Sequence, residues 1–249
     1  MSTALVTQEL FNKMDFNASA ATKATETNKG TSSPQPSVLI VFANSDINAA
    51  LYHLSKSLEN PFATKAIATV LVQESIKNDF VEKLKQQLKP YPKEAVNNNE
   101  HFIKALSTAH KLSAQLITIA QKEANVYAPT LVCDFTHEQL GSTTPSGIVT
   151  FHTFRTAKEA IALVNKESFK FNSVSIWHEN HSYAYELVAA LKSENYFINC
   201  YQVPLTGLAD NVTQGKNYVS LDKSYHYETL QHDGIQKCIV FPIGSIFAN

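Results

Sequence analysis

Residues 60–88 read NPFATKAIATVLVQESIKNDFVEKLKQQL, and this stretch is the strongest indicator of the fold class. Its ATVLVQ portion is a continuous apolar run, which is typical of a strand buried on both faces of a parallel sheet. The segment that follows carries Ile76, Phe80, Val81 and Leu84, whose spacing places them on one face of a helix. The stretch therefore predicts a strand, a turn and a helix of an α/β domain.

The same alternation continues along the chain. An apolar strand over Val38–Phe42 precedes a helical pattern over residues 44–58. Helical patterns are also predicted over residues 75–88, 100–124, 156–166 and 182–193. Further strands are predicted over Ala68–Val72, Thr130–Cys133, Val149–Phe154, Val174–Ile176 and Phe197–Asn199. This order predicts a three-layer α/β sandwich with a mainly parallel sheet flanked by helices.

The two ends of the chain differ from this pattern. Residues 17–37 contain no aliphatic side chain larger than Ala, so they cannot bury enough apolar area to offset their ordering entropy. We therefore predict a mostly flexible segment over residues 1–37 and a folded domain over residues 38–249. Residues 223–233, KSYHYETLQHD, are interpreted as a solvated polar loop. The C-terminal IQKCIVFPI, residues 235–243, is predicted to be an edge strand.

The composition excludes several classes of protein. The formal net charge is −1, which argues against a broad basic surface for nucleic acid or anionic membrane. No apolar run reaches the roughly 18 residues of a membrane span, and the N-terminus lacks the pattern of a signal peptide. Three cysteines are too few for a disulfide framework. We expect a cytoplasmic protein that binds neither nucleic acid nor membrane.

Five motifs, in the same order, resemble segments of the aldehyde dehydrogenase superfamily. VLVQESIKNDFVEKL, residues 70–84, is similar to the family's VLVQESIYDEFVEKL. The other four are VLIVFANSDINAAL (38–51), APTLVCDFTHEQL (128–140), VTFHTFRTAKEAIALVNKESF (149–169) and NSVSIWHENHSYAYELVAALKSENYFINCY (172–201). The resemblance implies the catalytic-domain fold of that family and, for intact members, oxidation of aldehydes with NAD or NADP.

The residues that the family uses for chemistry are changed at the matching positions. The reactive cysteine, six residues before VLVQ, corresponds to Thr64, and the glutamate that activates water falls at Ser32. The glutamate that holds the nicotinamide ribose corresponds to Thr143, and Pro145 replaces the phenylalanine near it. Most of the nucleotide-binding domain would precede residue 37, and its motifs are missing. Binding of NAD or NADP is therefore not expected.

These replacements remove the family's nucleophile and its partners. The family mechanism needs a thiolate that forms near neutral pH, and a threonine hydroxyl is a far weaker acid. Cys200, in INCYQV, is a weak substitute candidate, because free cysteines are usually small buried apolar residues. Cys133 and Cys238 are interpreted in the same way. With seven glycines and no GxGxxG motif, the chain has few places where backbone can wrap a phosphate.

The histidines give no metal site by spacing. His178 and His181 in HENH have helical metal-ligand spacing but no obvious third ligand, and we interpret them as surface residues. His226, with Glu228, and His232, with Asp233, belong to the predicted polar loop. We predict no metal site.

Three functions follow as hypotheses. The first is a non-catalytic member of the family, a pseudoenzyme that acts through binding or oligomerisation. The second is a residual or changed NAD(P)-linked oxidoreductase acting on aldehydes, and the third is a fragment completed by a separate nucleotide-binding chain. We expect the partner to be a second copy or an intact aldehyde dehydrogenase that pairs with the C-terminal strand, because exposed edges favour strand addition.

Overall fold

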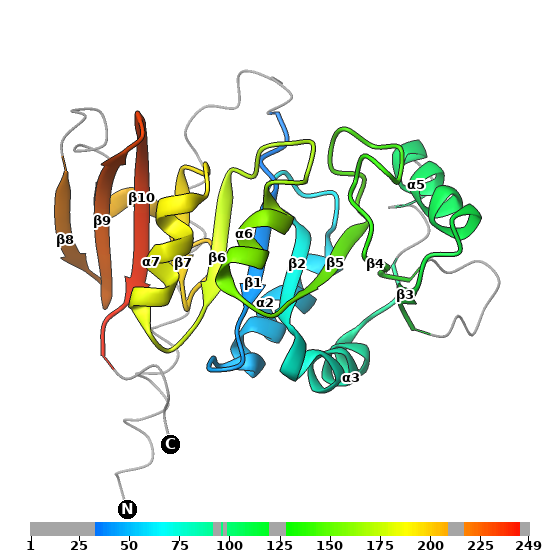
Figure 1. Cartoon of the computed structure of the whole chain (residues 1–249), viewed down its shortest axis with the longest axis horizontal. Helices are drawn as coiled ribbons and strands as arrows, with labels where there is room; N and C mark the ends of the chain where they lie inside the picture. Colours follow the sequence, from blue (N-terminus) through cyan, green and yellow to red (C-terminus); the bar gives the residue numbers. More distant parts are fainter. Residues whose placement is uncertain (1–32, 92–95, 97–98, 120–127, 209–216, 245–249) are drawn as a thin grey trace, which may run out of the picture. The chain divides into compact units, whose positions relative to one another are not determined.

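The structure is a computed structural model that describes residues 33–91, 96, 99–119, 128–208 and 217–244 (Figure 1). Contacts group Pro34–Asn249 into one unit. Most of the segment predicted to be flexible, residues 1–37, lies outside the described residues. In the described part of the chain, no helix is both long enough and apolar enough to cross a membrane.

The described strands form one ten-stranded sheet in the order β3-β4-β5-β2-β1-β6-β7-β10-β9-β8. The seven strands from β4 to β10 in this order run parallel. They are β4 (Leu131–Cys133), β5 (Val149–Phe154), β2 (Ile67–Gln73), β1 (Ser37–Val41), β6 (Ser173–Trp177), β7 (Asn195–Ile198) and β10 (Ile235–Pro242). β3 (Leu116–Ile117) at one end, and β9 (Tyr225–His232) and β8 (Tyr218–Asp222) at the other, are antiparallel to their neighbours. The predicted α/β fold with a mainly parallel sheet is confirmed.

Helices cover both faces of the sheet (Figure 1). α6 (Ala157–Val164) and α7 (His181–Ala190) share one apolar cluster with the sheet, and α2 (Ile47–Glu59) and α3 (Lys77–Gln87) share another. α5 (Glu100–Lys111) packs near β4 through a third cluster. Two short 3₁₀ helices, η1 (Glu74–Ile76) and η2 (Leu205–Leu208), complete the described elements.

The uninterrupted apolar sequence of β1 is explained by the burial of both its faces. Val38 and Ile40 belong to the cluster that α6 and α7 complete, whereas Leu39 and Val41 belong to the cluster of α2 and α3. Successive strand residues point to opposite faces, and here both faces are buried. All four side chains are therefore inaccessible to solvent.

The C-terminal strand does not lie at the edge of the sheet, so that prediction is wrong. β10 lies between β7 and β9, parallel to the first and antiparallel to the second. The segment interpreted as a polar loop, residues 223–233, instead contains all of β9 and residues of the turns on either side of it. Asp233 and Gly234, both with positive φ (51° and 74°), turn the chain from β9 into β10, as expected for an Asp-Gly hairpin. The described edge is β8.

The helix predicted over residues 100–124 is shorter. α5 ends at Lys111, and Ser113 has a left-handed φ of 52° that cannot continue a helix. The chain then forms β3, which pairs with β4. Pairing with the sheet therefore overrides the apolar spacing of Leu116 and Ile117.

A buried lysine connects the C-terminal hairpin to α7. The Lys237 side chain, on β10, donates hydrogen bonds to the carbonyl oxygens of Val188 (2.6 Å), Ala189 (3.0 Å) and Leu191 (2.9 Å). These carbonyls lie at the C-terminal end of α7, where backbone acceptors lack helical partners and the helix dipole favours a cation. Burial lowers the pKa of Lys237, and the three acceptors stabilise its ammonium group.

Candidate functional site

The loop between α2 and β2 carries Thr64. α2 ends at Glu59, Pro61 follows, and the loop returns the chain to β2 at Ile67. Thr64 is exposed, and its carbonyl accepts a hydrogen bond from the Gln35 backbone N–H at 2.7 Å. In the described part of the chain, no side chain forms a hydrogen bond with the Thr64 hydroxyl. Among the described residues, the hydroxyl is therefore not bonded to a base of the kind that activates a nucleophile.

A cavity of about 250 Å³ lies beside this loop. His53 and Lys56 of α2, Lys65 of the loop, and Tyr201 and Gln202 after β7 contribute to its lining. The Lys65 carbonyl accepts hydrogen bonds from the Tyr201 hydroxyl (3.0 Å) and from Gln202 Nε2 (2.5 Å). Burial lowers the pKa of His53. The cavity can accept a small polar ligand, but it presents no thiol.

The three thiols are buried and unreactive in character. Burial raises the pKa of Cys200, whose thiol donates to the Val240 carbonyl at 3.5 Å. Burial, together with Asp134, raises the pKa of Cys133 to about 11. Burial also raises the pKa of Cys238. Because the thiolate is the nucleophile, none of these residues replaces the cysteine that the resemblance implies at position 64.

The loop that carries Thr143 contacts the Thr64 loop. Gly147 has a φ of 87°, and the Phe62 ring occupies the space where a Cβ atom at Gly147 would lie. Thr143 itself is exposed. The two loops therefore pack together through Phe62 and Gly147, but neither threonine contributes a carboxylate or a thiol to this contact.

At the matching position, the described residues lack the carboxylate that the resemblance implies for holding a nicotinamide cofactor. A threonine at position 143 cannot supply the carboxylate that would accept hydrogen bonds from a ribose. The described glycines with positive φ are Gly141, Gly147, Gly234 and Gly244. None of them directly precedes a described helix, as a glycine of a phosphate-binding turn would.

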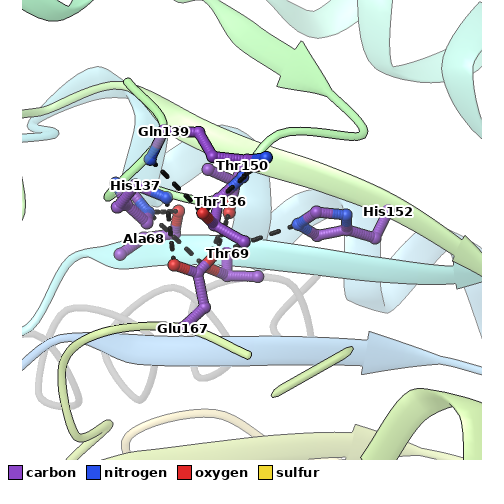
Figure 2. Close-up of polar contacts among 8 residues, drawn as sticks. All are labelled: Ala68, Thr69, Thr136, His137, Gln139, Thr150, His152 and Glu167. Carbon is purple, nitrogen blue, oxygen red and sulfur yellow. Dashed lines mark hydrogen bonds and ion pairs between the residues drawn. The ribbon is translucent and has the colours of Figure 1, made fainter. Parts of the chain in front are cut away.

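A buried polar cluster, which sequence analysis did not identify, lies between β2, β5 and the segments that follow β4 and α6 (Figure 2). The Glu167 side chain is 0% exposed. It accepts hydrogen bonds from the His137 backbone N–H and from the Thr150 hydroxyl, both at 3.0 Å. Thr69 Oγ1 lies 2.8 Å from Thr150 Oγ1. The cluster fixes the start of the loop that carries Thr143 to the segment after α6.

Two imidazoles complete this cluster (Figure 2). His137 Nε2 donates to the Ala68 carbonyl at 2.9 Å, and His152 Nε2 lies 3.8 Å from Glu167 Oε1. Burial lowers the pKa of His137, although the nearby Glu167 carboxylate opposes this effect. Burial would raise the pKa of Glu167, but His152, His137 and Thr150 together hold it below its ordinary value. The cluster therefore contains an ionised carboxylate and a neutral His137.

Sequence spacing does not show this cluster, because its members are far apart in the chain. Thr69, His137, Thr150 and Glu167 come from four separate segments. The only local signal is that polar residues interrupt apolar strands, as Thr150 and His152 do in VTFHTF. That signal indicates a polar contact but does not identify the partner.

His178 is buried, so its interpretation as a surface residue is wrong. Its ring packs against Phe42 and stacks on Tyr183, and its Nδ1 accepts the Asn180 backbone N–H at 2.9 Å. His178 therefore orders the turn into α7. His181 is partly buried against Phe241.

The histidines of the hairpin also have structural contacts. The His226 ring stacks on Phe241, with centroids 4.2 Å apart, and its Nε2 lies 3.3 Å from Glu228 Oε2. His232 Nδ1 lies 3.5 Å from Asp233 Oδ2. Among the described residues, no group of three or more His, Cys, Asp or Glu side chains is arranged to hold a metal ion.

Comparison with solved structures identifies the fold as that of the aldehyde dehydrogenases. A putative aldehyde dehydrogenase from Burkholderia cenocepacia is 22% identical, with a TM-score of 0.56 over 66% of this chain and 39% of that chain. An NADP-dependent glyceraldehyde-3-phosphate dehydrogenase from Bacillus halodurans C-125 is 18% identical (TM-score 0.56; 69% and 39% covered). A salicylaldehyde dehydrogenase from Pseudomonas putida G7 is 14% identical (TM-score 0.57; 87% and 47% covered).

The chain belongs to the family described as "Protein of unknown function (DUF1487)", whose model matches residues 32–247. No curated protein matches the chain significantly. The chain spans less than half the length of the three dehydrogenases. At these identities the likeness establishes the fold and leaves activity to be argued from the site.

Proposed function

We propose that this chain is a non-catalytic protein on the aldehyde dehydrogenase fold, a pseudoenzyme that acts by binding. The observation that carries the proposal is the loop between α2 and β2. It holds Thr64, which the resemblance matches to the family's nucleophile; this residue is exposed, and among the described residues its hydroxyl is not bonded to a base. Hydride transfer to a nicotinamide would require a positioned cofactor, and Thr143 offers no carboxylate to hold its ribose.

The cavity beside the loop supports a role in binding. Lys56 and Lys65 bring positive charge to its lining, and Gln202 and Tyr201 bring polar groups. Glu59 pairs with Lys56 at 3.2 Å, so Lys65 is the lysine better placed to meet a ligand. The lining combines apolar surface with these polar groups, which suits a small ligand that has an apolar body and a polar or anionic end.

The alternative is a residual or changed NAD(P)-linked oxidoreductase that uses another nucleophile. Cys200 is the thiol that such an enzyme would recruit. It is buried, and its raised pKa keeps it protonated near neutral pH. The non-catalytic proposal is therefore the better supported one.

The test is a turnover assay of the purified chain with short and aromatic aldehydes and with NAD⁺ or NADP⁺. An intact aldehyde dehydrogenase serves as the positive control. We expect no reduced nicotinamide above the rate without protein. A rate that is proportional to protein concentration and is abolished in Thr64→Ala or Cys200→Ala would overturn the proposal.

A further inference from the structure

A cavity of about 280 Å³ lies between α3 and the end of the sheet that β3 and β4 form (Figure 1). None of its lining residues belongs to the cavity beside the Thr64 loop. Its volume is just below the roughly 300–1,000 Å³ of pockets for drug-sized ligands, which indicates room for a smaller molecule. The function proposed above leaves this cavity without a role.

One wall of the cavity is a face of α3. Lys77, Val81 and Lys85 follow one another along this face, because residues four apart are neighbours on a helix. At a rise of about 1.5 Å per residue, the two lysine Cα atoms lie about 12 Å apart along the helix axis. Phe80 and Leu84, on the adjoining face, are fully buried and fix the helix to the sheet. The wall therefore consists of two cationic residues with an apolar residue between them.

The opposite wall is apolar. Ile117 of β3 and Cys133 at the end of β4 belong to the same apolar cluster as Val81. They are 3% and 2% exposed. The Cys133 backbone N–H donates to the Gln115 carbonyl at 2.9 Å, which holds the two strands together here. Because a buried thiol behaves as a small apolar group, the middle of the cavity favours the apolar body of a ligand.

The two lysines bring positive charge to the two ends of the α3 wall. In the part of the chain that the structure describes, neither Lys77 nor Lys85 forms an ion pair, whereas Lys83 of the same helix pairs with Asp79 at 2.9 Å. Glu82 also lines the cavity, but it is exposed, and among the described residues it pairs with neither lysine. The lining therefore carries more positive than negative charge.

Both lysine charges act across the cavity. Burial and Asp134 raise the pKa of the Cys133 thiol, and Lys77 and Lys85 both act against this increase by favouring the thiolate. An anion that lies over Cys133 is therefore attracted from both directions. A carboxylate that leaves water needs a compensating charge or hydrogen bonds, so anionic groups are best placed at the two lysine ends.

We propose that this cavity binds a small dianion with an elongated apolar body, of the straight-chain dicarboxylate class. One carboxylate pairs with Lys77 and the other with Lys85, and the methylene chain lies against Val81, Ile117 and Cys133. Lysine suits this task, because its flexible stem lets the ammonium group follow the end of a ligand. The proposal goes beyond the proposed function, because it concerns a different cavity and does not depend on whether the chain turns over aldehydes.

The first test is isothermal titration calorimetry of the full chain with azelate, a straight-chain dicarboxylate. We expect saturable binding at one site, with a dissociation constant raised about fivefold to tenfold in Lys77→Met and in Lys85→Met, because each substitution removes a charge and keeps an apolar stem. Lys83→Met, on the same helix and outside the cavity lining, is the matched control and should leave the affinity unchanged. Circular dichroism checks the fold, and Lys77→Gln and Lys85→Gln replace a methionine variant that does not fold.

Absence of azelate binding at millimolar concentration would overturn the proposal. So would an azelate affinity that neither Lys77→Met nor Lys85→Met weakens. If Lys65→Met weakened it instead, azelate would occupy the cavity beside the Thr64 loop, and the site on α3 would be wrong.

The second test separates a dianion from a fatty anion. Nonanoate has the same chain length and one carboxylate, so it should bind about tenfold or more weakly than azelate, because one ion pair and its hydrogen bonds are lost. Nonanoate that binds as tightly as azelate would show that the cavity recognises a single anionic end and an apolar body. That result would overturn the assignment to the dicarboxylate class.

Discussion

The central strands β1, β2, β5 and β6, here called the core half, and the strands β8, β9 and β10, here called the hairpin half, are stabilised in different ways. Almost every residue of the core half is buried, because helices cover both faces. In the hairpin half, burial decreases from β10 to β9 and again to β8. The core half is packed on both faces, whereas the hairpin half has its buried apolar residues, such as Tyr227 and Val240, in β9 and β10 and leaves β8 largely exposed.

The core half also shows that a fold can be kept while the groups used for catalysis are replaced. The core half has the aldehyde dehydrogenase fold, yet the loop leading into β2 holds Thr64 at the position where the resemblance implies a thiol. A packed sheet needs only apolar volume and correct patterning, whereas catalysis needs particular groups at particular positions. The two requirements can therefore be lost independently.

The largest expected effect is a cavity in the core half. Leu54→Ala, on the buried face of α2, should lower the free energy of unfolding by about 2–5 kcal/mol. The matched substitution in the hairpin half, Leu221→Ala, should change it by less than about 0.5 kcal/mol, because that side chain is mostly exposed. Urea unfolding followed by circular dichroism measures both. Equal losses would contradict the contrast between the two halves.

A smaller effect is expected where the hairpin half is connected to α7. Lys237→Met keeps the apolar stem but removes the ammonium donor from the carbonyls of Val188, Ala189 and Leu191. Leu191 still accepts a hydrogen bond from the Tyr196 hydroxyl. We expect a loss of about 1–3 kcal/mol in the free energy of unfolding. Lys158→Met, on the exposed face of α6, is the control and should be near neutral. If Lys237→Met proved as stable as the native chain, the lysine would not be needed for this connection.

The smallest expected effect is on the pH dependence of stability. It tests the proposed charge state of His137 in the polar cluster. The pKa of His137 is lowered in the folded chain by burial, so the unfolded chain takes up this proton first on acidification. The stability that neutral His137 contributes is present above pH about 6.5 and is lost as the pH falls toward its folded pKa. His137→Gln should therefore reduce the loss of stability between about pH 7 and 5, and His101→Gln, exposed on α5, should not. Identical pH profiles for the native chain and His137→Gln would contradict this.

The sequence allowed the core half to be predicted because its strands are continuous apolar runs. In the hairpin half, β10 was predicted as a strand but β8 and β9 were missed, although TyrHisTyrGluThr alternates with period two and Asp233-Gly234 is a strong hairpin signal. The many polar side chains in residues 223–233 led to the interpretation of this segment as a loop. The end of α5 at Lys111 could not be predicted from spacing, because pairing of β3 with β4 is a tertiary effect.

The candidate site was predictable only in part. Counting from VLVQ assigned Thr64 to the nucleophile position, because spacing along one segment is visible in the sequence; this assignment stays a prediction. The partners of Glu167 come from segments about 17 to 30 residues away, and no local period records such contacts. The same holds for the burial of His178, which results from packing against Phe42.

The central proposal is that this chain does not turn over aldehydes, because several groups that the resemblance implies for catalysis are replaced together. The most direct measurement is turnover by Thr64→Cys, which restores a thiol on the exposed loop, with thiol alkylation measured in parallel. We predict that iodoacetamide labels the new thiol while the rate of nicotinamide reduction with an aldehyde stays at the background without protein. Aldehyde-dependent reduction of NAD⁺ or NADP⁺ by Thr64→Cys would show that only the nucleophile had been lost, and would contradict the account.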